Sequence, residues 1–206
     1  MKKPGQTARM RSAKLAVAAQ SLNQASGVNG AAFCLAFLTD RARAPEPEII
    51  IAALPPGAAV ILRDYEAPDR AALAQKLKAL CTARDVLFLV GADLALAQAI
   101  GADGVHFPSW KTVRPAPGMI ATAACHSAPE LEKAAAGGAQ LALLSPVFTT
   151  QSHPGAQTLG AARFKSIART SPLSVLALGG VDAANAGRLA GRNVAGLAAI
   201  SGFLPD

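Results

Sequence analysis

Glycine and hydroxyl residues follow two short apolar runs in the last third of the chain. Gly179 and Gly180 come after the run at 174–178, and Ser201 and Gly202 come after the run at 195–200. Glycines leave backbone N–H groups accessible, because no side chain blocks the approach of an anion. The pattern predicts a phosphate-binding site built from these four residues.

His126 follows another apolar run, at 119–123, and could move protons. Imidazole has an ordinary pKa of about 6.5, which suits acid/base catalysis near neutral pH. The alternative is a structural histidine that only hydrogen-bonds to the backbone. For His106 we expect a packed, hydrogen-bonded residue of the protein interior.

The segment 149–160 is rich in Gly, Pro and Gln and is long enough to form a lid. We expect four of its residues to contact a substrate: Thr149, Thr150, Ser152 and His153. His153 either binds a carboxylate or is simply solvated. Arg63 is a candidate clamp for carboxylate or phosphate, or else it forms an ion pair with Asp40 or Asp64.

Eight short apolar runs alternate with helical patterns from about residue 32 onward, which predicts an α/β fold closed as a single-domain TIM (β/α)8 barrel. The expected strands are Phe33–Thr39, Ala59–Arg63, Val86–Val90, Gly104–Phe107, Met119–Ala123, Leu141–Ser145, Ser174–Leu178 and Ala195–Ile200. The expected helices are Glu46–Leu54, Asp69–Ala83, Ala92–Ile100, Ser127–Ala136, Ala161–Arg169 and Ala183–Leu189. A doubly wound sheet is the rival architecture, but the chain has no G-x-G-x-x-G after a strand. In a barrel of this kind, the loops after strands 7 and 8 commonly hold a substrate phosphate.

The two ends of the chain depart from a regular barrel. Only five residues, Gly202–Asp206, follow the last strand, so the eighth helix is expected to be truncated. We divide the chain into a basic N-terminal extension at 1–30, partly helical or disordered, and a barrel domain at 31–206. An Ala-rich helix at Met10–Gln24 could cover the face that the missing helix leaves open.

Composition limits the classes of function. The net charge is +7, and five cations precede the first acidic residue: Lys2, Lys3, Arg9, Arg11 and Lys14. This stripe lacks interleaved aromatics and any nucleic-acid motif, so we expect no nucleic-acid partner. No run reaches the about 20 apolar residues of a membrane span. The three cysteines have no metal-ligand spacing and are expected to be free thiols, which favours a cytoplasmic protein.

Seven motifs recur in the order and spacing of one known family. They are Leu38-Thr-Asp-Arg41, Val60-Ile-Leu-Arg63, Ile100-Gly-Ala-Asp-Gly-Val-His106, Cys125-His-Ser127 with Glu130, Ser145-Pro-Val-Phe-Thr-Thr150, Leu178-Gly-Gly-Val181 with Asn185, and Ala199-Ile-Ser201. Over residues 33–203 the chain thereby resembles the thiamine phosphate synthase and thiazole tautomerase (TenI-like) superfamily. The resemblance implies a TIM barrel that binds a thiazole phosphate or thiamine phosphate.

The departures from the family pattern concern the metal and the pyrophosphate. Where the resemblance implies magnesium carboxylates, this chain has Ala92 and Lys111, and where it implies a pyrophosphate-gripping lysine it has Tyr65. Tyr65 and Trp110 are expected to fill the vacated pocket or to lie exposed. We therefore expect no cofactor and no metal site. The most favoured activity is that of a metal-independent thiazole tautomerase, in which the resemblance assigns the acid/base role to His126. Thiamine phosphate synthase and a non-catalytic phosphate binder or sensor stay open, as does a homo-oligomer.

Overall fold

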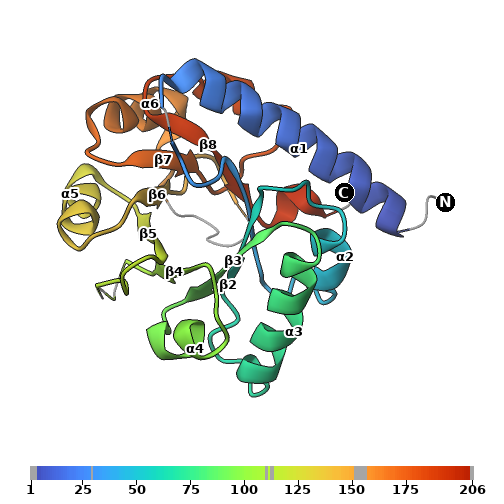
Figure 1. The fold of residues 1–206 in the computed structure, drawn as a ribbon. Coiled ribbons are helices and arrows are strands. Elements are labelled where there is room, and N and C mark those ends of the chain that lie inside the picture. The colour runs from blue at the N-terminus through green and yellow to red at the C-terminus, as the bar shows by residue number, and fades with distance from the viewer. Residues whose placement is uncertain (1–3, 29, 110, 112–113, 151–156, 205–206) are drawn as a thin grey trace.

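The computed structural model describes residues 4–28, 30–109, 111, 114–150 and 157–204. Within them, eight parallel strands pair in sequence order, and β1 pairs with β8 to close the barrel (Figure 1). The strands are β1 (Leu35–Leu38), β2 (Ala59–Leu62), β3 (Leu87–Gly91), β4 (Gly104–Phe107), β5 (Ile120–Cys125), β6 (Leu141–Leu144), β7 (Ser174–Ala177) and β8 (Val194–Ala199). The predicted single-domain TIM barrel is confirmed.

Helices surround the barrel, as in other (β/α)8 folds (Figure 1). They are α1 (Pro4–Ser26), α2 (Pro47–Ile51), α3 (Arg70–Thr82), α4 (Leu94–Ala99), α5 (Ala128–Ala136) and α6 (Gly160–Thr170), with two 3₁₀ turns, η1 (Ala186–Leu189) and η2 (Ser201–Phe203). The helix expected at Ala183–Leu189 is only the short η1. Gly187 within this turn and Gly191 just after it explain the difference, since glycine is a poor helix former.

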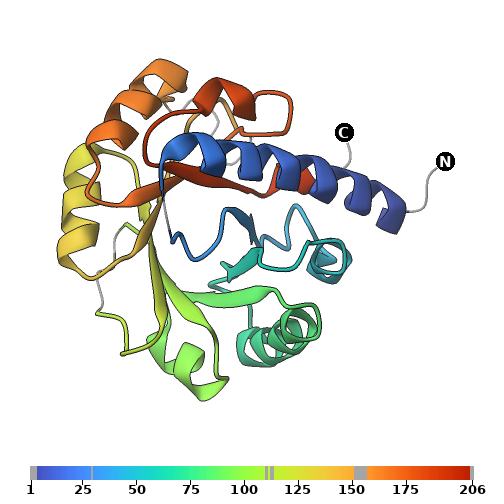
Figure 2. The same cartoon turned by 45° about the horizontal axis from the view of Figure 1, so that its top comes forward.

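The long helix α1 lies along the outside of the barrel and packs mainly against β8 (Figures 1 and 2). Its buried residues recur every three or four positions along one stripe: Ala8, Ser12, Leu15, Ala19, Leu22 and Ser26. Such spacing places them on a single face of a helix. After β8 the described chain has only η2. The predicted extra N-terminal helix is therefore confirmed, and α1 lies on β8, where the eighth helix of a regular barrel would pack.

Alternate residues of the strands pack into separate clusters. Phe37, Val60 and Phe88 belong to the larger one, whereas Ala36 and Leu89 belong to a smaller one. This division follows from strand geometry, because successive side chains point to opposite faces. No helix in the described ranges is long and apolar enough to span a bilayer.

Candidate functional site

A cavity of about 480 Å³ opens beside the ends of β7 and β8, within the size range of small-molecule sites. All four residues predicted to bind phosphate line it, as do two of the predicted substrate-binding residues: Gly179, Gly180, Ser201, Gly202, Thr149 and Thr150. The barrel thus brings together two segments, 179–180 and 201–202, that lie about twenty residues apart in the chain.

The backbone conformation at positions 179 and 180, and the close approach of the chain after β6, both favour glycine. The φ angles of Gly179 and Gly180 are +87° and +66°, a region that favours glycine. A Cβ on Gly180 would lie 2.4 Å from the carbonyl oxygen of Thr149, and one on Gly179 would lie 2.8 Å from Cα of Pro146. The two glycines therefore let the chain after β6 approach closely, which places Thr149 in the cavity wall.

Side-chain hydrogen bonds hold the turn after β7. Nδ2 of Asn185 donates to the carbonyl oxygen of Gly180 at 2.8 Å. The Asp182 carboxylate accepts from the amides of Ala184 and Asn185, both at 2.8 Å, just before η1. In the described part of the chain, the amides of Gly180 and Ser201 donate no backbone hydrogen bond, which leaves them as donors for an anion.

His126 lies exposed just after β5, at the end of the barrel where active sites of this fold occur. Its Nδ1 is 2.8 Å from the carbonyl oxygen of Ser145, which follows β6. A carbonyl only accepts hydrogen bonds, so Nδ1 carries the proton and Nε2 of the neutral ring has a lone pair. The amide of His126 donates to Oε2 of Glu130 at 3.0 Å, which fixes its backbone.

A side-chain cap begins α5, directly after His126. Ser127 is the N-cap residue and accepts from the amide of Glu130 at 3.4 Å, with Pro129 in the first turn. The same glutamate thus serves both the helix and the backbone of the histidine.

His106 is buried at the end of β4, with Nδ1 2.9 Å from Oγ1 of Thr122. Burial, with a smaller contribution from the positive charge of Arg63, lowers its pKa to about 3. The ring is therefore neutral at physiological pH and does not exchange protons with a ligand there. The prediction of a packed interior histidine is confirmed.

Arg63 lies half-buried after β2. Burial raises the pKa of the Tyr65 phenol, and the nearby positive charge of Arg63 partly opposes this rise. Burial acts to raise the pKa of Asp40, but hydrogen bonds from Arg43 and the charges of Arg43 and Arg63 outweigh it, so that pKa is lowered. Asp64 instead accepts from the backbone amide of Arg41 at 2.8 Å. Of the two acidic residues expected near Arg63, it is thus Asp40 whose pKa the charge of Arg63 lowers.

The part of the barrel mouth above β2 and β3 is filled by side chains. The Tyr65 ring lies over Gly91, where a Cβ would be only 3.0 Å from Cε1 of the ring, as expected of a residue that fills this space. Arg70 donates to the carbonyl oxygens of Gly91 and Asp64, and its guanidinium lies 5.8 Å from the centre of the Tyr65 ring. Its side chain is only 13% exposed, so this network is a fixed part of the mouth.

Lys111 and Ala92 are brought together in the structure. Nζ of Lys111 donates to the carbonyl oxygen of Ala92 at 2.7 Å. Magnesium is held by oxygen ligands, typically carboxylates, whereas these two positions provide a methyl group and an ammonium. Nor do the described ranges contain a group of three or more His, Cys, Asp or Glu residues placed to bind a metal. The residues present do not fit the magnesium ion that the family resemblance implies.

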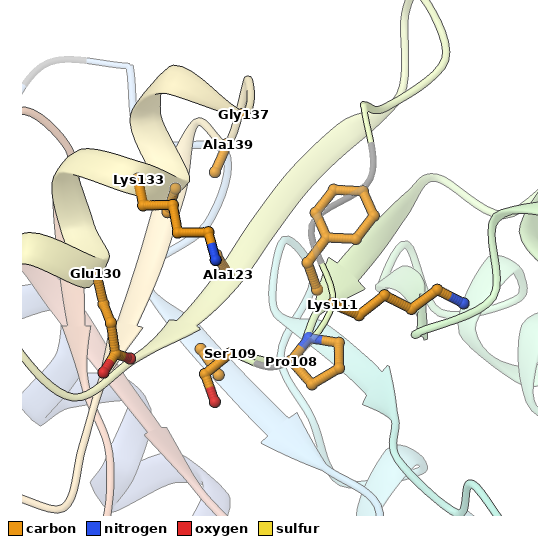
Figure 3. A pocket seen from close by; sticks show the side chains of 11 residues that line it. Pro108, Ser109, Lys111, Ala123, Glu130, Lys133, Gly137 and Ala139 are labelled. Atoms are coloured by element: carbon orange, nitrogen blue, oxygen red, sulfur yellow. The ribbon is translucent and has the colours of Figure 1, made fainter.

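A much smaller cavity, of about 30 Å³, lies between the end of β4 and α5 (Figure 3). Figure 3 shows Lys111 pointing away from the helix that carries Glu130 and Lys133. A space of this size holds a water molecule or two, not a substrate. Of these two cavities, only the one beside β7 and β8 has room for a substrate.

Three residues singled out by sequence, Trp110, Ser152 and His153, lie outside the described residues. Two arginines that line the cavity were not predicted as site residues. Arg11 of α1 and Arg43 of the turn after β1 both contribute to its wall. Arg11 stood out only as part of the basic stripe, and nothing in the spacing of either arginine indicates a shared site.

Comparison with known proteins supports the family assignment. The family model described as "Thiamine monophosphate synthase" (TMP-TENI) matches residues 35–203. A thiamine-phosphate synthase from Methanococcus maripaludis is 31% identical over 63% of this chain, which spans 65% of that relative. A thiamine-phosphate synthase from Pyrococcus furiosus is 31% identical, with 82% of this chain and 86% of the relative covered.

A solved structure gives the same result. Thiamine phosphate pyrophosphorylase from Pyrococcus furiosus superposes with a TM-score of 0.68 at 28% identity, covering 81% of this chain and 85% of that one. Residues 35–203, which match the family model, include all eight strands and every described residue of the cavity wall except Arg11 and Leu204. This protein therefore belongs to the thiamine monophosphate synthase (TMP-TENI) family of thiamine biosynthesis.

Proposed function

We propose that this protein binds a thiazole phosphate monoester in the cavity beside β7 and β8 and moves a proton on it, as a metal-independent thiazole tautomerase. The observation that carries the proposal is the geometry of His126. Its Nδ1–H is committed to the Ser145 carbonyl, so Nε2 is the basic atom and has a defined direction.

In this proposal the phosphate is held by backbone amides of the two glycine-containing turns, at Gly179, Gly180, Ser201 and Gly202. Anchoring the phosphate on one side of the mouth orients the thiazole ring across it. Nε2 of His126 then takes a proton from one carbon of the ring system and returns it to another, which makes the ring aromatic with no net change of charge. Such a step needs one acid/base group and no metal ion.

The names of the relatives favour a second candidate, thiamine phosphate synthase. That reaction releases pyrophosphate, whose growing negative charge calls for magnesium and cationic side chains. The filled space around Tyr65 and the pairing of Lys111 with Ala92 weigh against it here. A binder or sensor without catalysis is the remaining candidate, because the phosphate cavity alone would suffice for it.

The first experiment tests the acid/base role. His126→Asn keeps an N–H near the Nδ1 position for the Ser145 carbonyl but removes Nε2. We expect turnover of the carboxythiazole phosphate to fall by about 10²–10⁴-fold, the usual cost of losing an acid/base group. The affinity for the product, measured by calorimetry, should change little. If the variant is as fast as the wild type, His126 is structural; if the wild type binds the ligand without converting it, the binder is the correct reading.

The second experiment separates tautomerase from synthase. The protein is incubated with thiazole phosphate, pyrimidine pyrophosphate and Mg²⁺, and thiamine phosphate is measured by chromatography with and without a chelator. We expect no product in either case. Product that disappears on chelation would overturn the proposal in favour of the synthase.

The third experiment tests the cavity itself. Ser201 is exposed at the start of η2, so Ser201→Asp adds a negative charge without a clash in the core. We expect it to abolish binding of the phosphate ester, while Ser201→Ala, which adds no charge, retains it. Gly180→Val is a poorer probe, because a Cβ on Gly180 would clash with the carbonyl oxygen of Thr149 and disturb the fold.

A further inference from the structure

Two arginines from outside the glycine-containing turns share the ligand cavity. Arg11 belongs to α1 and Arg43 to the turn after β1, and both line the cavity with Gly180 and Ser201. Backbone amides supply hydrogen bonds to a phosphate but no full charge. A guanidinium supplies both, in a planar fork that matches phosphate oxygens.

The surroundings of Arg43 give it a structural role. Nε and Nη2 of Arg43 both donate to Oδ2 of Asp40, and the Arg43 side chain is only 20% exposed. The positive charge of Arg43 is thereby matched by a carboxylate of the protein. Asp182, the acidic residue of the wall, uses its carboxylate to hold the turn of Ala184 and Asn185.

Arg11 is placed by the packing of α1 on the barrel. Ser12 and Leu15 are fully buried, and a Cβ on Gly202 would lie 3.7 Å from Cδ1 of Leu15. Leu15 thus abuts the turn that contains Ser201. Arg11 lies four residues earlier, on the same face of the helix and one turn away, which is how its side chain comes to line the cavity. With five N–H donors, a guanidinium can hold a protein group and a phosphate together.

We propose that Arg11 is a specificity residue of the ligand site: it neutralises the phosphate and makes the protein prefer the phosphate ester to the unphosphorylated alcohol. This inference rests on the proposed binding of a thiazole phosphate. It assigns a ligand contact to α1, which lies outside the residues, 35–203, that match the family model. The helix that replaces the eighth helix of the barrel is then also part of the site.

The test compares hydroxyethylthiazole phosphate with hydroxyethylthiazole as ligands in titration calorimetry of the full chain. Arg11→Met keeps most of the apolar stem and removes the charge. We expect it to weaken binding of the phosphate by roughly tenfold to a hundredfold, as for loss of a charged hydrogen bond, and to leave binding of the alcohol unchanged. Arg11→Lys should recover part of the loss.

Lys14→Met is the matched control, because Lys14 is on the same helix but lines only the neighbouring groove between α1 and η1. It should bind the phosphate like the wild type. Equal affinity of the wild type and Arg11→Met would overturn this inference and leave the proposed function intact, whereas a wild type that binds no phosphate ester would refute the proposed function itself. If Arg11→Met has a lower melting temperature than the wild type, Arg11→Lys is measured at several salt concentrations instead. Lysine keeps the charge but lacks the planar guanidinium, so its affinity for the phosphate should be lower at every salt concentration. The dependence of that affinity on salt should match the wild type.

Discussion

The buried neutral ring of His106 should make the stability of this protein depend on pH well above the range in which carboxylates titrate. In the unfolded chain the ring has its ordinary pKa of 6.5, and in the folded protein burial lowers that pKa to about 3. Below pH 6.5 the unfolded state therefore binds a proton that the folded state does not bind. Above pH 6.5 the proton uptake of this ring does not lower the unfolding free energy. The unfolding free energy decreases as the pH falls below 6.5, and this decrease ends near pH 3, where the folded protein also binds the proton.

The size of the effect follows from the difference between the two pKa values. Each pH unit in this window is worth about 1.4 kcal/mol. His106 should therefore cost about 2 kcal/mol of unfolding free energy between pH 7.5 and pH 5, and about 5 kcal/mol in all if the window extends to pH 3. Most carboxylates are still ionised at pH 5, so the upper part of the window isolates the histidine.

Urea denaturation at pH 7.5 and pH 5 measures this difference. His106→Gln keeps a polar, neutral side chain that can bond to Thr122 but cannot titrate. Its unfolding free energy at pH 7.5 will be lower, but it should lose about 2 kcal/mol less than the wild type between the two pH values. If His106→Gln shows the same pH dependence as the wild type, the reasoning is refuted, because the ring would then titrate similarly in both states.

Three further predictions concern stability and metal ions. Ala92 has a φ of +61°, so Ala92→Gly should raise the unfolding free energy by up to about 1 kcal/mol in urea denaturation, and a decrease would contradict the strain argument. Leu22 is buried between α1 and β8, so Leu22→Ala should cost about 2–5 kcal/mol, while Val17→Ala, at a side chain 64% exposed, should change stability by less than about 0.5 kcal/mol. Because the ammonium of Lys111 stands where a metal ligand would be needed, Mg²⁺ should not change the affinity for thiazole phosphate in calorimetry, and tighter binding with Mg²⁺ would count against this.

The strands could be predicted from the sequence because each is a short apolar run with a clear end. The range predicted for β4, Gly104–Phe107, is the observed one, and the other strands differ by a residue or two at their ends. Such shifts reflect hydrogen bonding at the rim of the sheet, which a single strand does not determine. The helix expected after β7 is only the short η1, because two glycines weaken a helix that the apolar pattern alone predicts to be longer.

The candidate site was only partly predictable, for a different physical reason. Gly179, Gly180, Ser201 and Gly202 could be grouped because parallel strands of a barrel end at the same face. Arg11 reaches the cavity because α1 packs on β8. The sequence predicts a helix that could cover this face, but not which of its residues reaches the cavity. The contacts of Tyr65 with Arg70 and of Lys111 with Ala92 likewise depend on which loops meet in the folded barrel.

The two enzymatic candidates make different demands on the filled part of the mouth. Lys111 is held at Ala92 by one hydrogen bond in an exposed place, worth about 1 kcal/mol, so a second substrate could displace it at small cost. Arg70 is mostly buried, donates to two backbone carbonyls and packs beside the Tyr65 ring that covers Gly91. Opening this network would expose and unpair several groups at once, at a cost of several kcal/mol. Phosphate oxygens of a substrate can replace a missing metal ligand, but a second substrate cannot enter space that side chains already fill. Tyr65 and Arg70 therefore favour a reaction with one substrate more strongly than the missing carboxylates do.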